Sequence, residues 1–484
     1  MKNILIACAI VSGLLMASLA RSETPLTIKK ALADMLRNQP RLDAAALQVQ
    51  RSQLQTPVVR SQLGWIWKGQ AGVSHDMGFT GVPSDRVDVG TGVQRKTQSG
   101  NSLELGANYS LEDSESPFIP TYPNPANTTK VDISYRTPLS QGSGNPDYQH
   151  DLISAEAGAA QASAQQQRLR DQLSGQLMDI FYSAAMTRAR IKSAEAAIDR
   201  AERLKKFIEK NIYLGISEQK DRLQVDAQLH AQIAEAKGLL VIWEKQRTSL
   251  NRLMGQPWDS DVSPLVQELT EDSPESVKAI IDEVIRNSPD RVDTVARLQI
   301  AETVIARSRD KQKNQLDLVM SLGGRNVSGD STLGAVDETD YAGKVQLEFR
   351  RTMDRKGVDA QLTQAQLDRS ILLKQVQDIK MELEYTVKGL LSEIEASRIA
   401  LADYEVRFQS EKKKYQEANN RYRTGRTDIS ELIRFENELQ QAELAVELKH
   451  IELASKLAAL ELLRGTVWRD VMPIPPMTQE QADG

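Results

Sequence analysis

The chain lacks the residues that several common protein classes depend on. It has a single cysteine, Cys8, among 484 residues, and only 5% of its residues are aromatic. Cys8 lies in the apolar stretch 4–19, which follows Lys2 and ends at the small residues Ser18-Leu19-Ala20. This pattern predicts a secretory signal over residues 1–20. The mature chain would then contain no cysteine, which excludes disulfides and thiol chemistry although the chain is exported.

The same cysteine also suggests a lipoprotein cleavage box, because it follows Leu5-Ile6-Ala7. Cleavage before Cys8 would leave only about four apolar residues, whereas the apolar core of a signal needs roughly seven or more. The secretory signal is therefore the favoured interpretation.

Long apolar runs are also missing. After residue 20, no stretch of the sequence approaches the roughly 18 apolar residues of a membrane helix, so any membrane span must be built from strands. The formal net charge is −5, with many charges of both signs, and this balance argues against a nucleic-acid partner.

Catalytic and metal-binding motifs are missing as well. The sequence contains no G-x-x-x-x-G-K-[ST], no H-E-x-x-H and no G-x-S-x-G motif. Its four histidines are far apart in sequence and are expected to be solvated surface residues: His75, His150, His230 and His450. We therefore expect no enzyme activity, no cofactor and no metal site.

The sequence does contain an internal repeat, which can decide a fold. Arg37-Asn38-Gln39-Pro40 matches Arg286-Asn287-Ser288-Pro289, and each follows a short segment with spaced apolar residues. Later, Gly215 and Gly425 are followed at equal spacings by apolar and acidic residues, and Gly255 and Gly465 close the two copies. The glycine pairs are 210 positions apart (425 − 215) and the prolines 249 (289 − 40), so the first copy holds 39 extra residues.

The repeat predicts two domains of similar plan, a first over 21–270 and a second over 271–468, followed by a flexible tail, 469–484. Proline-free and spaced apolar segments predict long and short helices in each domain. Those of the first are 41–63, 147–212 and 217–254, and those of the second are 290–314, 358–422 and 427–464. Pro57 should kink or end the first of these helices, and Ser217 and Thr427 are candidate N-caps. Helices this long suggest antiparallel, coiled-coil-like packing.

Within 64–138 and 315–351 the apolar period changes to two. The runs include Trp65–Val73, Leu103–Leu111, Val131–Tyr135, Leu316–Leu322 and Val345–Phe349. Runs of this kind are typical of membrane strands of about 9–11 residues, and also of half-buried strands in a soluble sheet. Five such runs beside very long helices favour a membrane β-barrel portion.

One segment makes the strand count open. Residues 86–112 form an additional candidate hairpin that turns at Ser99-Gly100-Asn101, and its size accounts for most of the 39-residue excess. Its apolar face favours a place in the membrane, where it would add two strands. The alternative is a cap or loop outside the membrane.

With these features the chain resembles the outer-membrane efflux protein family, the TolC-like channel components of tripartite exporters. The most specific matches are the helix-turn-helix segments 213–221 and 421–431, the closing Leu253-Met254-Gly255, and the two-repeat plan. The resemblance implies a mainly α fold in which a homotrimer shares one β-barrel in the outer-membrane lipid and a helical periplasmic tunnel. It also implies a periplasmic adaptor and an inner-membrane pump as partners, in a Gram-negative bacterium.

The resemblance places the hairpin turns, with Gly215 and Gly425, at a periplasmic aperture. Asp221 and Glu431 each lie six residues beyond these glycines, so we expect six carboxylates around the closed entrance of a trimer, with Asp428 adding to the ring. Arg434 has the position to pair with Glu431. The alternative is that these acids only complement a helix dipole, which contributes about 0.3–1 kcal/mol. Tyr422 is either a gate residue or a packing aromatic.

The predicted function is passive conduction through an outer-membrane channel of a tripartite efflux or type I secretion system. The competing hypothesis is a periplasmic helical-hairpin adaptor or scaffold without a pore, although adaptors normally carry one long hairpin instead of two matching copies.

Overall fold

The computed structural model describes residues 24–77, 83–115, 120–214, 218–267, 276–424 and 426–467. The predicted signal and tail lie outside these ranges, as do Gly215, Gly425 and Ser217. The chain divides into two compact units, which are described separately. Unit 1 comprises 1–46, 165–291 and 379–484, and unit 2 comprises 47–164 and 292–378. Each unit takes segments from both predicted repeats, so the compact units do not follow the repeat boundary at 270.

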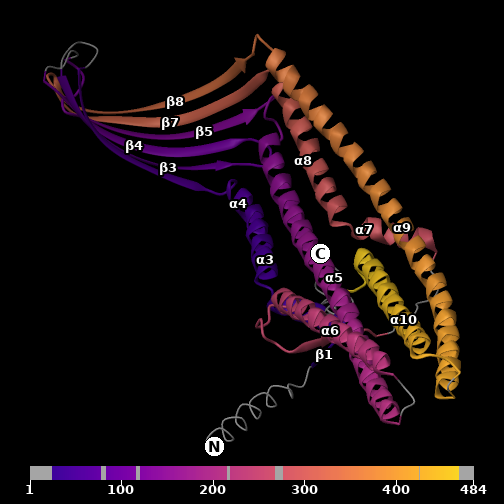
Figure 1. Cartoon of the computed structure of the whole chain (residues 1–484). Helices are drawn as coiled ribbons and strands as arrows, with labels where there is room; N and C mark the ends of the chain where they lie inside the picture. Colours follow the sequence, from indigo (N-terminus) through magenta and orange to yellow (C-terminus); the bar gives the residue numbers. More distant parts are fainter. Residues whose placement is uncertain are drawn as a thin grey trace, which may run out of the picture. The chain divides into compact units, whose positions relative to one another are not determined.

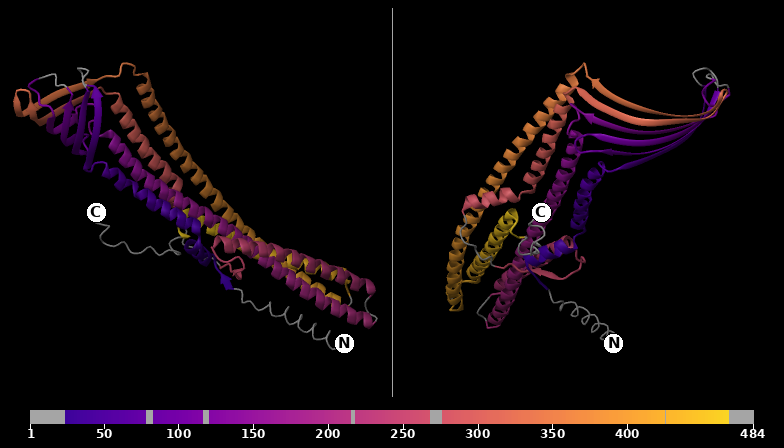
Figure 2. Two further views of the ribbon diagram at one scale, coloured as in Figure 1. Left: turned by 90° about the vertical axis from the view of Figure 1, so that its left-hand side faces the viewer. Right: turned by 180° about the vertical axis from the view of Figure 1, so that it is seen from behind.

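Unit 2 contains one antiparallel sheet of six strands in the order β2-β3-β4-β5-β7-β8 (Figure 1). The strands are β2 (Ile66–Met77), β3 (Pro83–Lys96), β4 (Ser102–Ser114), β5 (Ala126–Pro138), β7 (Gln315–Ser331) and β8 (Gly334–Arg350). They stay side by side in both views of Figure 2. Strands β5 and β7 are neighbours although a long stretch of chain separates them. Strands β2 and β8 are the two edges of the sheet.

Helices α3 (Pro40–Gln53), α4 (Gln55–Ser61) and α8 (Pro289–Lys311) precede the strands of the two copies. The break between α3 and α4 falls at Leu54, three residues before Pro57. Proline cannot donate a hydrogen bond to the carbonyl four residues earlier, and its ring clashes with that carbonyl. The predicted effect of Pro57 on this helix is confirmed.

Two helices of 68 residues, α5 (Pro146–Tyr213) and α9 (Lys356–Arg423), begin in unit 2 and end in unit 1. Each is followed by the returning helix of a hairpin, α6 (Gln219–Leu253) or α10 (Ile429–Arg464). Among the described residues, no helix has a stretch long and apolar enough to cross a membrane.

Unit 1 also contains the short amphipathic helices α2 (Ile28–Asn38) and α7 (Val277–Asn287). A short parallel pair, β1 (Thr24–Leu26) with β6 (Val262–Pro264), joins the start of the described chain to the segment after α6. The largest apolar core of the unit collects side chains of α2, α5, α6 and α10 around fully buried residues that include Phe181, Leu177, Leu250 and Met254. Helix α7 packs against α9 and α10 in a separate apolar cluster around Val284 and Val387, so each short helix is anchored to long hairpin helices.

The repeated Asn-x-Pro segments meet the ends of the hairpin helices in each copy. Gln39 donates from Nε2 to the carbonyl of Leu253 at 3.0 Å, and Asn287 donates from Nδ2 to the carbonyl of Arg464 at 2.8 Å. Both carbonyls belong to the last turn of a helix, where no intrahelical donor remains. Both copies therefore tie this segment to the end of a returning helix, but through different positions of the repeat, because Asn287 aligns with Asn38 and not with Gln39.

Candidate functional site

The sheet of unit 2 has two chemically different faces. Alternate residues of a strand point to opposite faces, and directly paired residues share a face. The register therefore assembles one apolar face from all six strands. Its members are Trp67, Ala71, Val73, Val87, Val89, Val93, Leu103, Leu105, Ala107, Tyr109, Leu111, Val131, Ile133, Tyr135, Leu316, Leu318, Met320, Leu322, Tyr341, Val345, Leu347 and Phe349.

The opposite face is polar and carries ion pairs between strands. Lys68 on β2 lies 3.7 Å from Glu104 on β4. Arg136 on β5 bridges Asp317, at 2.9 Å, and Glu348, at 3.0 Å. A sheet with one apolar and one charged face is suited to a boundary between lipid and water.

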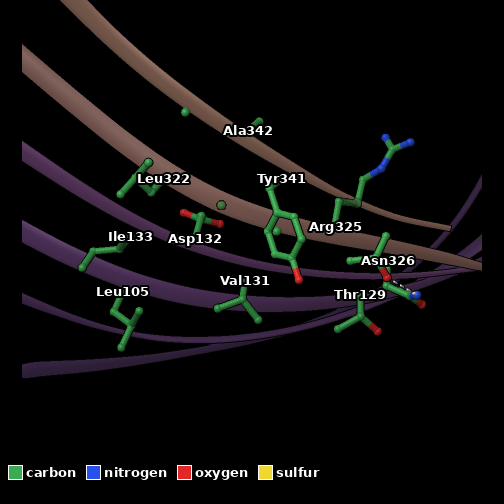
Figure 3. A pocket seen from close by; sticks show the side chains of 14 residues that line it. Leu105, Thr129, Val131, Asp132, Ile133, Leu322, Arg325, Asn326, Tyr341 and Ala342 are labelled. Atoms are coloured by element: carbon green, nitrogen blue, oxygen red, sulfur yellow. Dashed lines mark hydrogen bonds between the residues drawn. The ribbon is translucent and has the colours of Figure 1, made fainter.

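A hollow of about 580 Å³ lies mainly on the apolar face and is drawn in Figure 3. Leu105, Val131 and Ile133 line it together with Tyr341. The hollow exists because glycines at this level of the strands have no side chain to fill it. A Cβ on Gly324 would lie only 3.3 Å from the Tyr341 ring. The hollow is therefore part of the apolar surface, with an aromatic ring packed over backbone.

The additional hairpin belongs to the sheet. Strands β3 and β4 pair with each other around residues 97–101, where Gly100 has a φ of 91°, a left-handed conformation that favours glycine. They also pair with β2 and β5, so they are inserted between these strands. Leu103, Leu105, Tyr109 and Leu111 lie on the common apolar face, as their spacing predicts.

The predicted gate residues lie at the ends of the hairpins in unit 1. Asp221, in the first turn of α6, accepts a hydrogen bond from the backbone N–H of Glu218 at 3.1 Å in a capping box. Asp428 is the N-cap of α10 and accepts from the backbone N–H of Glu431 at 2.9 Å. The prediction of Thr427 as N-cap is wrong by one residue, because the carboxylate of Asp428 reaches this donor. Thr427 donates instead to the Glu431 carboxylate.

The two helix starts lie close together. Ser430 on α10 donates to Gln224 on α6 at 3.3 Å, and Gln228 donates to Asn437 at 3.1 Å. Asp221, Asp428 and Glu431 therefore belong to one end of unit 1, and each of them has a contact that stabilises a helix start.

Tyr422 packs against Phe207, with ring centroids 6.0 Å apart. It joins a small apolar cluster built around the buried Ile208, Val225 and Leu432. Arg434 lies 4.0 Å from Glu438 and over the ring of Phe435. The proposed pairing of Arg434 with Glu431 is thus replaced by contacts farther along α10.

Basic side chains also lie near the hairpin tips, beside the acidic residues predicted from the sequence. Lys220 lies 2.9 Å from Glu218, and Arg421, Arg423 and Arg426 flank the second turn as exposed residues. They could be read directly from the sequence, because the three arginines stand beside Gly425 and Lys220 lies five residues after Gly215. Their positive charge opposes the field of the acidic residues.

Asp226 and Glu436 occupy matching positions of the two repeats, and each forms an ion pair with a basic residue of another helix. Asp226 on α6 lies 2.7 Å from Lys205, and Glu436 on α10 lies 3.0 Å from Arg200. Both basic partners are on α5, so this helix holds its own returning helix and that of the other repeat. The pairing with Lys205 lowers the pKa of Asp226. Burial raises the pKa of Glu436 in spite of Arg200.

In the part of the chain that the structure describes, no group of three or more histidine, cysteine or acidic residues is arranged to hold a metal ion.

Comparisons with known proteins concern the fold. No protein-family model matches the sequence, and no curated protein matches it. Among solved structures, the outer-membrane channel OprN is similar with a TM-score of 0.66 and 19% identity, over 90% of this chain and 89% of that chain. The outer membrane protein VceC from Vibrio cholerae is similar with a TM-score of 0.65 and 16% identity, over 90% and 96%. The Campylobacter jejuni outer membrane channel CmeC gives 0.61 and 14%, over 93% and 90%.

These similarities cover both the long hairpins and the sheet, since they extend over about nine tenths of the chain. The resemblance inferred from the two-repeat sequence is confirmed at the level of the fold: this chain has the fold of outer-membrane channel proteins.

Proposed function

We propose that the protein is the outer-membrane subunit of an export channel in a Gram-negative bacterium. Three copies would share one membrane barrel, with their helical hairpins forming a tunnel in the periplasm. Solutes delivered by an inner-membrane pump and a periplasmic adaptor would cross passively. The observation that carries the proposal is the continuous apolar face across all six strands, opposite a face of ion pairs.

A single copy cannot hold this sheet in lipid. Each edge, β2 and β8, leaves a row of backbone N–H and C=O groups without a strand partner in the described chain. In hydrocarbon each unsatisfied group costs several kcal/mol. Neighbouring copies that pair at these edges would remove this cost, which supports an oligomer closed into a barrel.

The competing function, a periplasmic adaptor without a pore, does not account for this sheet. Trp67 and Phe349 are 73% and 64% exposed on the edge strands, in the same face as the apolar side chains of the inner strands. In water such a surface would favour aggregation. In lipid it is the surface that a membrane strand presents.

Two neighbouring residues of β5 test the proposal. Ile133 lies on the apolar face and Ser134 on the polar face. Arginine on the lipid side costs about 2–4 kcal/mol near the middle of the bilayer, and every subunit would carry that cost. We expect Ile133→Arg to abolish heat-resistant trimers in outer-membrane fractions, while Ser134→Arg leaves them intact.

Native mass spectrometry of the detergent-extracted protein gives the number of subunits, and conductance in a planar bilayer shows whether they form a channel. A stable folded monomer, or equal tolerance of Ile133→Arg and Ser134→Arg, would refute the membrane channel.

We also propose that the hairpin tips form the closed periplasmic entrance, with Asp221, Glu431 and Asp428 as its acidic ring and Tyr422 packed behind it. Like charges held close together attract cations, as charged rings do in other pores. Because Lys220 and the nearby arginines weaken this field, we expect a modest cation preference with block by multivalent cations.

A further inference from the structure

The apolar face does not run straight across the strands. On β2 the apolar run Trp67–Val73 is centred on Gln70, which the register places in the row of Lys130 on β5. On β8 the run Tyr341–Phe349 is centred on Val345, which lies in the row of Tyr135. Between the two edge strands the apolar band therefore shifts along the strand direction by five residues, an average of one residue for each of the five steps between strands.

This shift measures how the strands are inclined in a membrane. Five residues advance about 17 Å along a strand, and five steps between strands cover about 24 Å. If the apolar band lies parallel to the membrane plane, the strands are inclined by about 35° to the membrane normal. The usual inclination of membrane strands is roughly 35–45°. The inserted strands β3 and β4 follow the same band, so they share this inclination.

The edges of the sheet are compatible with each other. The six strands alternate in direction, so β8 of one copy and β2 of the next run antiparallel when the copies stand in a ring. Extending the shift by one more step gives six residues per copy. This is an even number, which keeps apolar residues opposite apolar residues because side chains alternate with a period of two.

From these observations, and on the basis of the proposed trimeric channel, we infer that β8 pairs with β2 of a neighbouring copy with Val345 opposite Ala71, closing an eighteen-stranded barrel. The same register places Phe349 opposite Trp67 and extends the apolar band without a step. Both aromatic side chains, which are mostly exposed in a single copy, then form a cross-strand pair at the subunit boundary.

The consequence is a wide membrane pore. Eighteen strands spaced about 4.8 Å apart and inclined by about 35° give a backbone diameter of roughly 34 Å, compared with roughly 22 Å for twelve strands at the same inclination. The polar face would line this lumen with its ion pairs, including those of Arg136. Such a lumen admits hydrated solutes that are too wide for the narrower barrel.

Cysteine crosslinking tests the register. Cys8 is the only cysteine of the chain and would be removed with the predicted signal, so the mature protein offers a clean background. Directly opposite residues have Cβ atoms about 4.5–5.5 Å apart, close enough for a disulfide after small adjustments. We expect Ala71→Cys with Val345→Cys to give covalently linked trimers on a denaturing, non-reducing gel.

The control pairs change only the register. Ala71→Cys combined with Gly343→Cys or Leu347→Cys corresponds to a shift of four or eight residues per copy, and should crosslink much less. The inferred register would be overturned if trimers form under reducing conditions but crosslink to position 71 through position 343 or 347. It would also be overturned if such trimers crosslink through none of positions 343, 345 and 347. Failure to form any trimer would instead count against the proposed function.

A second measurement tests the strand number. Spin labels at Leu105 and Leu111 on β4 should be accessible to a lipid-soluble relaxation agent and protected from a water-soluble one. Water accessibility at both positions in an intact trimer would place β3 and β4 outside the membrane. The barrel would then have twelve strands, and the inference of a wide pore would be wrong.

Discussion

Gly255 and Gly465 occupy matching positions of the two repeats but have different surroundings. Their φ angles are 68° and 74°, so both adopt the left-handed conformation in which an alanine side chain is strained. A Cβ on Gly255 would lie 2.5 Å from the backbone oxygen of Asn38 and 2.8 Å from its carbonyl carbon. A Cβ on Gly465 would meet only the side-chain nitrogen of Asn287, at 3.8 Å.

The two substitutions should therefore differ in cost. Left-handed backbone costs alanine about 1–2 kcal/mol, and this is the whole expected effect of Gly465→Ala. In Gly255→Ala the backbone of Asn38 must also move, although the next residue, Gln39, is tied to the end of α6. Overpacking of this kind adds about 1–3 kcal/mol, so we expect a total of about 2–5 kcal/mol in each subunit.

Hydrogen exchange of the last turns of α6 and α10 measures these local free energies. Gly465→Ala should speed exchange at the end of α10 by roughly 5- to 30-fold, since about 1.4 kcal/mol corresponds to a factor of ten. Gly255→Ala should speed exchange at the end of α6 by a larger factor, or reduce the yield of assembled protein.

Substitution of each glycine by asparagine distinguishes backbone strain from steric overlap with a neighbouring residue. It tolerates left-handed backbone better than alanine does, so Gly465→Asn should restore most of the protection that Gly465→Ala loses. Gly255→Asn should not, because its Cβ still meets Asn38. Equal effects of alanine at both glycines, or a rescue by asparagine at both, would refute this reasoning.

Three further predictions concern unit 1. The double variant Asp221→Asn and Glu431→Gln keeps hydrogen-bond acceptors for the helix starts but removes two of the three acidic charges that each copy brings to the entrance. It should strongly reduce cation preference and multivalent block in single-channel recordings, while each helix loses no more than the ~0.3–1 kcal/mol that an acid contributes at a helix start. Unchanged selectivity would leave these acids only their role at the helix starts. Burial raises the pKa of Glu436 above its ordinary value near 4.5. Between these two pKa values the folded state binds more protons than the unfolded state, so the stability of the fold decreases as the pH rises through this window. Hydrogen exchange at the hairpin tips should therefore slow as the pH is lowered from neutral toward 4.5, after correction for intrinsic rates, and Glu436→Gln should remove this dependence; an unchanged dependence would contradict it. Phe181 is fully buried in the main core of unit 1, so Phe181→Ala should lower the free energy of unfolding by about 3–5 kcal/mol. Phe181→Leu leaves a smaller cavity and should cost clearly less, as measured by thermal denaturation. Similar losses in both variants would argue against a cavity as the cause.

Much of the secondary structure is encoded in local sequence patterns. The apolar period of two in Leu103–Leu111 predicted a strand, and Pro57 predicted the interruption that falls at Leu54. The spacing of Leu103, Leu105, Tyr109 and Leu111 also predicted a common face. These features are recoverable because backbone geometry and side-chain alternation depend only on residues a few positions apart.

The N-cap of α10 could not be assigned from the local sequence alone. Thr427 and Asp428 are adjacent residues of suitable type, and their order in sequence does not say which one caps α10. The structure places Asp428 at the N-cap because its carboxylate reaches the backbone N–H of Glu431. The choice depends on the path of the turn, which is set by how the neighbouring helices pack.

The sequence by itself determined the repeat, the long helices and the two-faced strands, because each rests on periodicity along the chain. Only the tertiary structure decided that β3 and β4 are inserted between β2 and β5, and that β5 lies beside β7. It likewise decided that Glu436 of the second repeat pairs with Arg200 of the first. These pairings join residues that are far apart in sequence, and the free energy that selects them comes from matching whole faces and burying charges together, which no local pattern records.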